Sequence, residues 1–478
     1  MTECRQQVFE FQDHFGRKVT ADFSGGYLSS DGGAPVVRAF DLKLGLIGRL
    51  ARCFDDRREQ ALVEHGVEEL LRQRIGGLVL GYEDLNDHDR LRLDPLHALM
   101  AGKQEIEGAD RLREADKGKA LAGHSTLNRF ELGALGGDGR YKKIIPAPAQ
   151  IESLLIEEGV KAIPRRSREI VLDFDATDDP LHGAQEGAFF HGYYRHYCYL
   201  PLYGFCGSIP LYAKLRDCKR DASEGTVEAL EKIVPAIRRR FGRKVRIIVR
   251  GDSGFARESI MAWCEAHGLY YGLGLARNAR LSAQLSESFE QLHRHIDAGQ
   301  IPLPCRQFVD FTYRTLNSWS RERRVIGKAE VLAKGDNPRF VVTNLPAEGF
   351  GEGEPGRFEA AALYERFYCA RGEMENRIKE QQLDLFADRT STRGMASNQL
   401  RLWLSTFAHL LVSRLRAEVL GGTELAAATI GTIRLKLFKI GARIKVSCRR
   451  IHLELASGYP YRELFAQVHR QLAAVPDG

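Results

Sequence analysis

The amino-acid sequence predicts a mixed α/β protein built around a mixed β-sheet. Between residues 168 and 275 the hydrophobic pattern switches repeatedly between the alternation of strands and the three- and four-residue spacing of amphipathic helices. Before residue 164 the helical spacing dominates. Because helices pack their apolar sides on sheets, the first pattern predicts a layered core and the second a mostly helical region. A chain of 478 residues is also too long for one ordinary core, so we expect several domains.

The composition excludes several classes of protein. Apolar residues make up 44% and charged residues 28%, as in a folded rather than a disordered chain. No stretch reaches the roughly 18 apolar residues of a membrane span, and the polar N-terminus lacks a secretory signal. The nine cysteines are scattered without a CxxC pair, which argues against disulfides and structural zinc. We therefore expect a cytoplasmic protein without a membrane partner.

The positive charge is clustered rather than spread evenly. The net charge is +7, and basic residues gather at 165–168, 238–244, 321–324 and 434–450. Such clusters suggest a polyanionic partner, usually nucleic acid, although each could also be a solvated helix face.

The N-terminal region, residues 1–164, is predicted to be helical and to bind DNA. Apolar residues at 34–53 and 59–80 have helical spacing. Further on, Ser125 or Thr126 could cap a short helix that carries Asn128 and Arg129 outward. This segment resembles the recognition end of a helix-turn-helix, and an ordinary surface helix is the alternative.

The next segments give the order of a catalytic core over residues 165–277. They are predicted strands at 169–175, 189–203 and 208–216, a helix at 223–241, a strand at 244–249, a helix at 256–267 and a strand at 269–275. Three strands, a helix, a strand, a helix and a strand is the order of an RNase H-like fold.

The remaining chain is predicted to hold an insertion, the rest of the core and a basic tail. Residues 278–338 form a β-rich insertion with strands at 308–315 and 324–332 and with Trp319 between them. A strand at 339–344 and a helix at 359–382 complete the core over 339–398. The tail, 399–478, holds a helix at 399–420 and basic β segments at 432–437 and 443–452, for DNA binding or dimerisation.

Three carboxylates stand where a two-metal nuclease needs them. Asp175 ends the strand at 169–175, Asp252 follows the strand at 244–249, and Glu375 lies in the late helix. Two-metal cleavage of a phosphodiester requires carboxylates that converge from separate elements on ions about 3.5–4 Å apart. Acids also end ordinary strands, so each residue alone has a structural alternative.

The late helix gives Glu375 a more specific context. Tyr368, Arg371, Glu375, Lys379 and Gln382 are three, four, four and three residues apart, so an α-helix would carry them on one face. This face would present Glu to metal and basic groups to phosphate. A solvated, salt-bridged surface is the alternative, as is packing of Tyr368 on the sheet.

These motifs resemble the DDE transposases of bacterial insertion sequences, in the group marked by a Tyr-x2-Arg-x3-Glu-x6-Lys helix. The helix matches at Tyr368, Arg371 and Glu375, the segment 173–179 resembles the first-Asp motif, and 250–255 resembles the second. On that match Asp175 is the ligand and Asp173 is not. Residues 24–33, 86–87 and 434–442 look like the insertion-sequence 1380 branch. The last position of the signature is Gln382 instead of Lys, and Lys379 is expected to replace it.

The resemblance implies a metal-dependent DNA-cutting and DNA-joining enzyme. It implies two Mg²⁺ ions, for which Mn²⁺ would substitute, and a water attack that leaves a 3′-hydroxyl, which then attacks another phosphodiester. The partners would be double-stranded DNA, namely the terminal inverted repeats and the target, bound by a homodimer on the bacterial nucleoid. Expected DNA contacts, besides the helix face, are Trp319 as a base-stacking platform and the basic residues Arg434, Lys436, Lys439 and Arg443.

Two other functions remain open at this point. One is another RNase H-like metal nuclease, such as a resolvase or repair enzyme, and the other is an inactive transposase-derived DNA-binding protein. The large insertion and the Tyr-Arg-Glu helix argue against the first, and the three intact acids argue against the second.

Overall fold

The computed structural model describes residues 7–135, 143–351 and 355–477, and the chain divides into two compact units. The first comprises Met1–Ala147, Asp384–Phe386 and Leu411–Gly478, and the second comprises Pro148–Leu383 and Ala387–Leu410. Across the described ranges, no helix has the length and apolar character needed to cross a bilayer.

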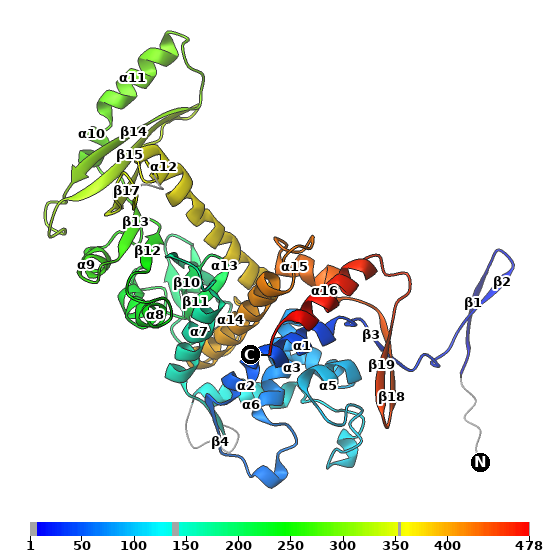
Figure 1. Ribbon diagram of the computed structural model, residues 1–478. Coiled ribbons are helices and arrows are strands. Elements are labelled where there is room, and N and C mark those ends of the chain that lie inside the picture. Colours follow the sequence, from blue (N-terminus) through cyan, green and yellow to red (C-terminus); the bar gives the residue numbers. More distant parts are fainter. Residues whose placement is uncertain (1–6, 136–142, 352–354, 478) are drawn as a thin grey trace, which may run out of the picture. The chain divides into compact units, whose positions relative to one another are not determined.

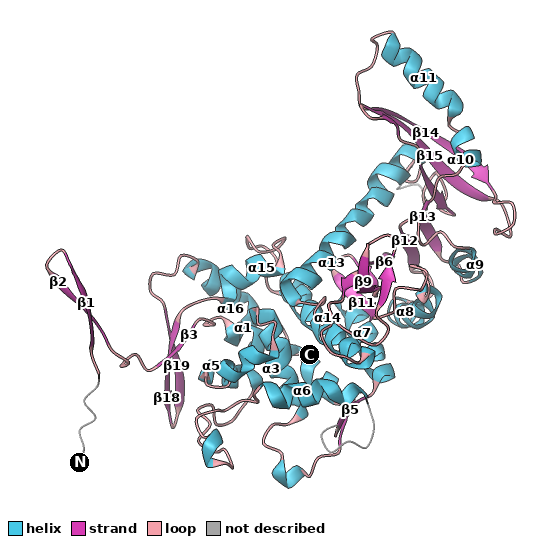
Figure 2. Cartoon of the chain, turned by 180° about the vertical axis from the view of Figure 1, so that it is seen from behind, coloured by secondary structure: helices cyan, strands magenta, loops and turns pink. Residues whose placement is uncertain are grey.

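The first unit is mostly helical but also contains short sheets (Figure 2). Its helices are α1 (Ala34–Leu44), α2 (Leu46–Ala51), α3 (Val67–Leu80), α4 (His88–Leu91), α5 (Pro95–Ala101), α6 (His124–Leu132), α15 (Ile430–Ile433) and α16 (Arg462–Ala474). Its strands are β1 (Phe9–His14), β2 (Arg17–Ala21), β3 (Tyr27–Ser29), β4 (Phe54–Asp56), β5 (Ile144–Pro146), β18 (Ala442–Ser447) and β19 (Arg450–Leu455). The hairpin β1–β2 was not expected in a helical region. The helix expected at 34–53 is broken at Gly45, whose φ of 62° ends α1.

The two ends of the chain are joined inside this unit. β3 pairs with β18 in a three-stranded sheet, and the amides of Gly32 and Gly33 donate to the carbonyls of Ile440 and Phe438 at 2.8 and 3.0 Å. The approach is so close that a Cβ on Gly33 would lie 2.0 Å from the carbonyl oxygen of Leu437. Glycine is therefore required there by space.

One segment of the tail differs from its prediction. Residues 432–437 were expected as a strand but are helical, in α15 and the π-helical turn η7 (Arg434–Phe438). Ile430, Ile433 and Leu437 are fully buried at helical spacing, whereas Leu435 is 67% exposed. The second segment does form strands, β18 and β19.

The second unit is organised around a nine-stranded mixed sheet. The order is β11-β10-β6-β12-β13-β17-β15-β14, and β16 pairs with β15. Its central strands β6 (Glu169–Ala176), β12 (Arg246–Gly251) and β13 (Tyr270–Leu275) are parallel, and the other pairs are antiparallel. The remaining strands of this sheet are β10 (Leu202–Cys206), β11 (Ile209–Lys214), β14 (Cys305–Tyr313), β15 (Arg323–Leu332), β16 (Gly335–Asp336) and β17 (Arg339–Thr343).

Apolar side chains cover both faces of this sheet. On one face Ile170, Leu172 and Phe174 of β6 join a core with α7 (Pro148–Ala162), α8 (Thr226–Phe241) and α9 (Glu258–Ala266). α7 falls inside the region 1–164 expected to bind DNA, yet it packs on β11 and α8. On the other face, two smaller clusters involve residues of the helices that follow β17. These helices are α12 (Ala360–Ala362), η5 (Leu363–Tyr368), η6 (Cys369–Arg371), α13 (Gly372–Leu385) and α14 (Met395–Glu418).

The insertion extends the sheet instead of forming a separate module. Its strands β14 and β15 join through β17, which pairs with β13. It also contains the helices α10 (Ala279–Ala283) and α11 (Ser286–Asp297), and α11 packs on β14 and β15 (Figure 1). The single strand expected at 189–203 is instead three strands, β8 (Phe189–His191), β9 (His196–Tyr199) and β10. β9 pairs with both β8 and β7 (Asp179–Pro180).

Candidate active site

The first two candidate carboxylates lie at the same edge of two neighbouring parallel strands. β6 and β12 pair from Arg246↔Glu169 to Gly251↔Phe174, so Asp175 and Asp252 follow the last pair side by side. The Asp252 carboxylate accepts a hydrogen bond from the amide of Gly254 at 2.8 Å, which fixes the loop after β12. Asp175 accepts from the amide of Ala176 at 2.9 Å.

The two acids of β6 have different surroundings. Asp173 and Asp175 are two residues apart and so point to the same face of the sheet. Asp173 is buried in a bidentate ion pair with Arg250 at 2.7 and 2.8 Å, and Arg250 also donates to the carbonyl of Phe367. The Asp173 carboxylate is thus paired within the core, whereas Asp175 faces Arg371 of the signature helix, the helical segment that carries residues 368–382.

Arg371 connects Asp175 with Glu375. Its guanidinium lies 3.4 Å from the Asp175 carboxylate and 3.0 Å from that of Glu375. The pKa of Asp175 is raised to about 7, because burial and the charges of Asp252 and Glu375 raise it more than Arg371 lowers it. The three predicted carboxylates therefore act on one another electrostatically. Within the described ranges, however, no three acidic, histidine or cysteine side chains lie close enough together to hold a metal ion as they stand.

The signature helix is not a single α-helix. It begins as α12, widens into the π-helix η5, tightens into a 3₁₀ turn and continues as α13. From Gly372 the chain is regular α-helix, and Arg371 contacts Glu375 at 3.0 Å as the spacing predicts, whereas Tyr368 ends a π segment. Such segments often occur at functional sites. Lys379 is exposed and makes no hydrogen bond or ion pair in the described part of the chain, while Gln382 donates to the carbonyl of Asp178 at 3.2 Å.

A cavity of about 350 Å³ opens beside Asp252. Tyr368 lines it, and burial raises the pKa of its hydroxyl. A Cβ on Gly274 would lie 2.4 Å from the Tyr368 hydroxyl oxygen, so the strand's glycine makes room for this ring. Arg277, Arg339 and Arg371 also line the cavity, which gives it three cations beside one predicted metal ligand.

Residues 11–477 match the family described as Transposase DDE domain group 1. The chain belongs to this transposase family. No curated protein matches the sequence. Among solved structures, the chain is similar to one described as a cryo-EM structure of the piggyBac transposase synaptic complex with hairpin DNA. The identity is 9%, the match covers 93% of this chain and 85% of that chain, and the TM-score is 0.41.

Several of the other residues expected to bind DNA are buried or already bonded within the protein. Trp319 is only 4% exposed and packs edge-on against Tyr313 in the core, so its position does not suit base stacking. In the tail, Arg434 donates to the carbonyls of Leu78, Val79 and Asp384, and the Lys439 ammonium lies 2.7 Å from the buried Asp31 carboxylate. Both side chains are therefore bonded to partners within the first unit.

Other candidates remain at the surface. Arg443, Asn128 and Arg129 are exposed, whereas Lys436 is half-buried and pairs with Glu424 at 2.9 Å. α6 begins at His124 with Gly123 as its N-cap and no side-chain cap, so Ser125 and Thr126 lie in its first turn instead of capping it.

Arg277 and Arg339 were missed by sequence reasoning. Arg277 lies two residues beyond β13, and Arg339 begins β17. The two strands pair antiparallel with Leu275 opposite Phe340, which brings the end of one to the start of the other. Both strands were predicted from their patterns, but nothing in the sequence predicted that they are neighbours.

Proposed function

We propose that this chain is a DNA transposase that cuts and joins the ends of an insertion sequence. The observation that carries the proposal is that Asp175 and Glu375 both contact Arg371 while Asp252 lies at the same end of the sheet, in a chain of the DDE transposase family. In this proposal, strands β11-β10-β6-β12-β13 form an RNase H-like core, because three antiparallel strands followed by two parallel ones match the expected order.

The three carboxylates are the proposed ligands of two Mg²⁺ ions. All their donors are oxygens, which hard divalent cations prefer. Burial and the charges of Asp252 and Glu375 raise the pKa of Asp175 to about 7, against the opposing effect of the Arg371 cation and the Ala176 amide. Arg371 already places positive charge between Asp175 and Glu375, the charge that such ions would also supply. When bound, the ions would supply Lewis acidity and an activated water.

The chain's own side chains would position the DNA. Arg371 lies next to two of the ligands and is proposed to bind the phosphate near the scissile bond, with Tyr368 beside it. Arg277 and Arg339, across the same cavity, would hold neighbouring phosphate oxygens. Lys379 is free to reach the backbone one turn beyond Glu375.

The proposed reaction has two phosphoryl transfers. Hydrolysis at the element end breaks the P–O3′ bond and leaves a 3′-hydroxyl. That hydroxyl then attacks a phosphodiester of the target, so one P–O bond forms as another breaks. A homodimer would hold two ends on the bacterial nucleoid, and the N-terminal region would read the inverted repeats through Asn128 and Arg129.

The test is cleavage of the DNA that flanks the gene. Asp175→Asn, Asp252→Asn and Glu375→Gln should each abolish Mg²⁺-dependent nicking of the element end and leave binding in a gel shift nearly intact. Glu373→Gln, which removes an exposed carboxylate from the same helix, is the matched control and should cut normally. Equal cutting of unrelated duplexes would indicate a general nuclease, and specific binding without cutting would indicate a DNA-binding protein.

A further inference from the structure

A second basic cavity lies near the start of the central strand β12, whereas Asp252 follows the end of that strand. It has a volume of about 730 Å³ and lies between the end of α8 and the end of α9, which we call the α8–α9 pocket. β12 starts next to this pocket at Arg246 and runs to Gly251, just before Asp252. At about 3.3 Å per residue, its six residues separate the pocket from Asp252 by about 20 Å.

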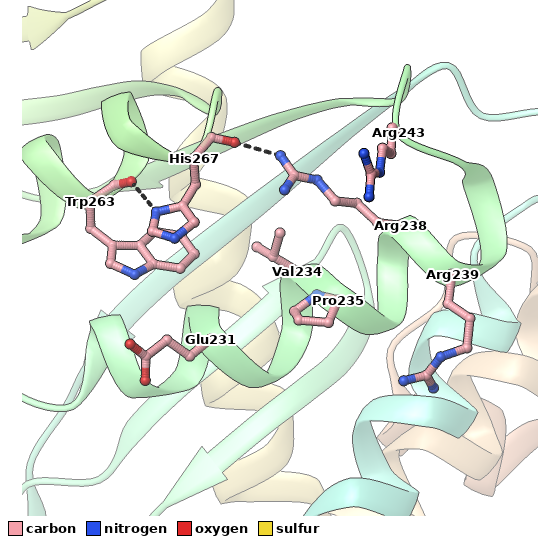
Figure 3. Close-up of a pocket in the computed structure, with 8 residues that line it drawn as sticks. All are labelled: Glu231, Val234, Pro235, Arg238, Arg239, Arg243, Trp263 and His267. Carbon is pink, nitrogen blue, oxygen red and sulfur yellow. Dashed lines mark hydrogen bonds between the residues drawn. The ribbon is translucent and has the colours of Figure 1, made fainter.

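The pocket combines arginines with a flat aromatic surface (Figure 3). Trp263 stacks on His267 with ring centroids 4.0 Å apart and planes 20° apart. Arg238 donates to the carbonyl of His267 at 2.5 Å. Arg239 and Arg243 are exposed and form no ion pair with any described residue.

The positive charge continues beyond the pocket. Arg239 also lines a neighbouring cavity of about 310 Å³ together with Lys161 and Arg240. Lys244 and the loop residues 165–166, which follow α7, are exposed cations as well. Glu231 is the single acid in the lining of the α8–α9 pocket.

Helix stability alone does not explain this surface. Basic residues in the last turn of α8 interact favourably with the helix dipole, which accounts for residues 238–240. Arg243 and Lys244 lie beyond the last turn of the helix, and the dipole gives no account of the stacked Trp263–His267 pair. A solvated helix end also has no need of an aromatic surface.

We propose that the α8–α9 pocket binds the phosphodiester backbone of DNA outside the segment held at the carboxylates. Guanidinium groups bind phosphate oxygens in bidentate geometry, and an aromatic surface accommodates a sugar or base between phosphates. The inference rests on the proposed function, since it assumes a DNA substrate. Because about 20 Å corresponds to about six base pairs, the segment is either a distal part of the same duplex or a second duplex.

Tryptophan fluorescence can test the pocket directly. The chain has three tryptophans, and Trp319 and Trp403 are only 4% and 3% exposed, so Trp263 is the one accessible to a quencher. DNA bound in EDTA should protect Trp263 from acrylamide quenching in the full-length protein. Arg239→Gln combined with Arg243→Gln should remove this protection and lower the slope of log Kd against log salt by about 2.

The control removes two exposed cations elsewhere in the second unit, by Arg294→Gln with Lys334→Gln, and should keep the protection. Element-end duplexes of increasing length and an added unrelated duplex distinguish the two sources of DNA. The proposal is overturned if Trp263 stays unprotected by every DNA, if both double variants behave alike, or if polyglutamate protects as well as DNA. Cleavage that depends on the carboxylates while Trp263 stays unprotected would refute the pocket and leave the proposed function standing.

Discussion

Replacing Asp175 with asparagine is expected to stabilise the metal-free protein, but only at neutral and higher pH. Burial and neighbouring carboxylates raise the pKa of Asp175 from 3.8 to about 7 in the folded chain. The folded protein therefore prefers protonated Asp175. The free energy of unfolding falls as the pH rises from the pKa of Asp175 in the unfolded chain through its pKa in the folded chain. Asparagine has the shape of the protonated acid and does not titrate.

The size of the gain follows from the same values. The difference between 3.8 and about 7, at 1.36 kcal/mol per pH unit, gives an upper bound on the order of 4 kcal/mol above pH 8. Below about pH 4 both variants carry a neutral group, and the difference should vanish. Relaxation of Arg371 and water will reduce the gain, so about 1–3 kcal/mol is expected.

Urea denaturation in EDTA at pH 4.5 and pH 8.5 measures this difference. Asp173→Asn is the matched control, because Asp173 lies on the same face of β6 but is paired with buried Arg250. Removing one partner of a buried pair should destabilise by about 3–5 kcal/mol, which is the opposite sign. The reasoning is refuted if Asp175→Asn gives no gain at pH 8.5, or the same gain at both pH values.

Three further outcomes are expected. Arg371→Ala should slow cleavage by about 10²-fold or more while DNA binding weakens little, and Gln382→Ala should change neither. If both variants cleave at the wild-type rate in single-turnover assays, Arg371 does not bind the phosphate. Gly33→Ala should lower the free energy of unfolding by about 1–3 kcal/mol, because its Cβ would overlap a backbone carbonyl. Gly458→Ala, with open space around it, should not lower it. Similar denaturation midpoints for the two variants would argue against the close approach at Gly33. Arg129→Ala should reduce the preference for the element end over a scrambled duplex, and an unchanged preference at two salt concentrations would exclude α6 from reading the end.

Local pattern predicted most of the sheet, and spatial pairing could not be predicted from it. The strand over 169–175 and the helix over 223–241 appear as β6 and α8 because alternation and helical spacing are local properties. The π-helix η5 was missed, since a widened turn leaves the residue types unchanged. Trp319 was expected to stack on DNA bases, but it is buried against Tyr313 at the end of β14, a contact that residue types in a loop do not reveal.

The candidate site divides in the same way. Asp175, Asp252 and Glu375 could be predicted because each follows or lies within a recognisable element. Arg277 and Arg339 could not, because they come together only through the pairing of β13 with β17. The choice of Asp175 over Asp173 rested on resemblance. The structure adds a physical reason, since Asp173 is neutralised by a buried arginine.

The basic tail illustrates why clustered charge is weak evidence for a DNA surface. Arg434 and Lys439 belong to the same cluster as Arg443, yet the first is bound to three carbonyls and the second to a buried aspartate. These contacts, with the β3–β18 pairing, join the tail to the N-terminal segment. A fragment ending at residue 164 would lose those partners and retain α7 without the sheet on which it packs. Recognition of the element end must therefore be assigned by substitutions at exposed residues in the full-length chain, because a fragment that fails to bind could simply have failed to fold.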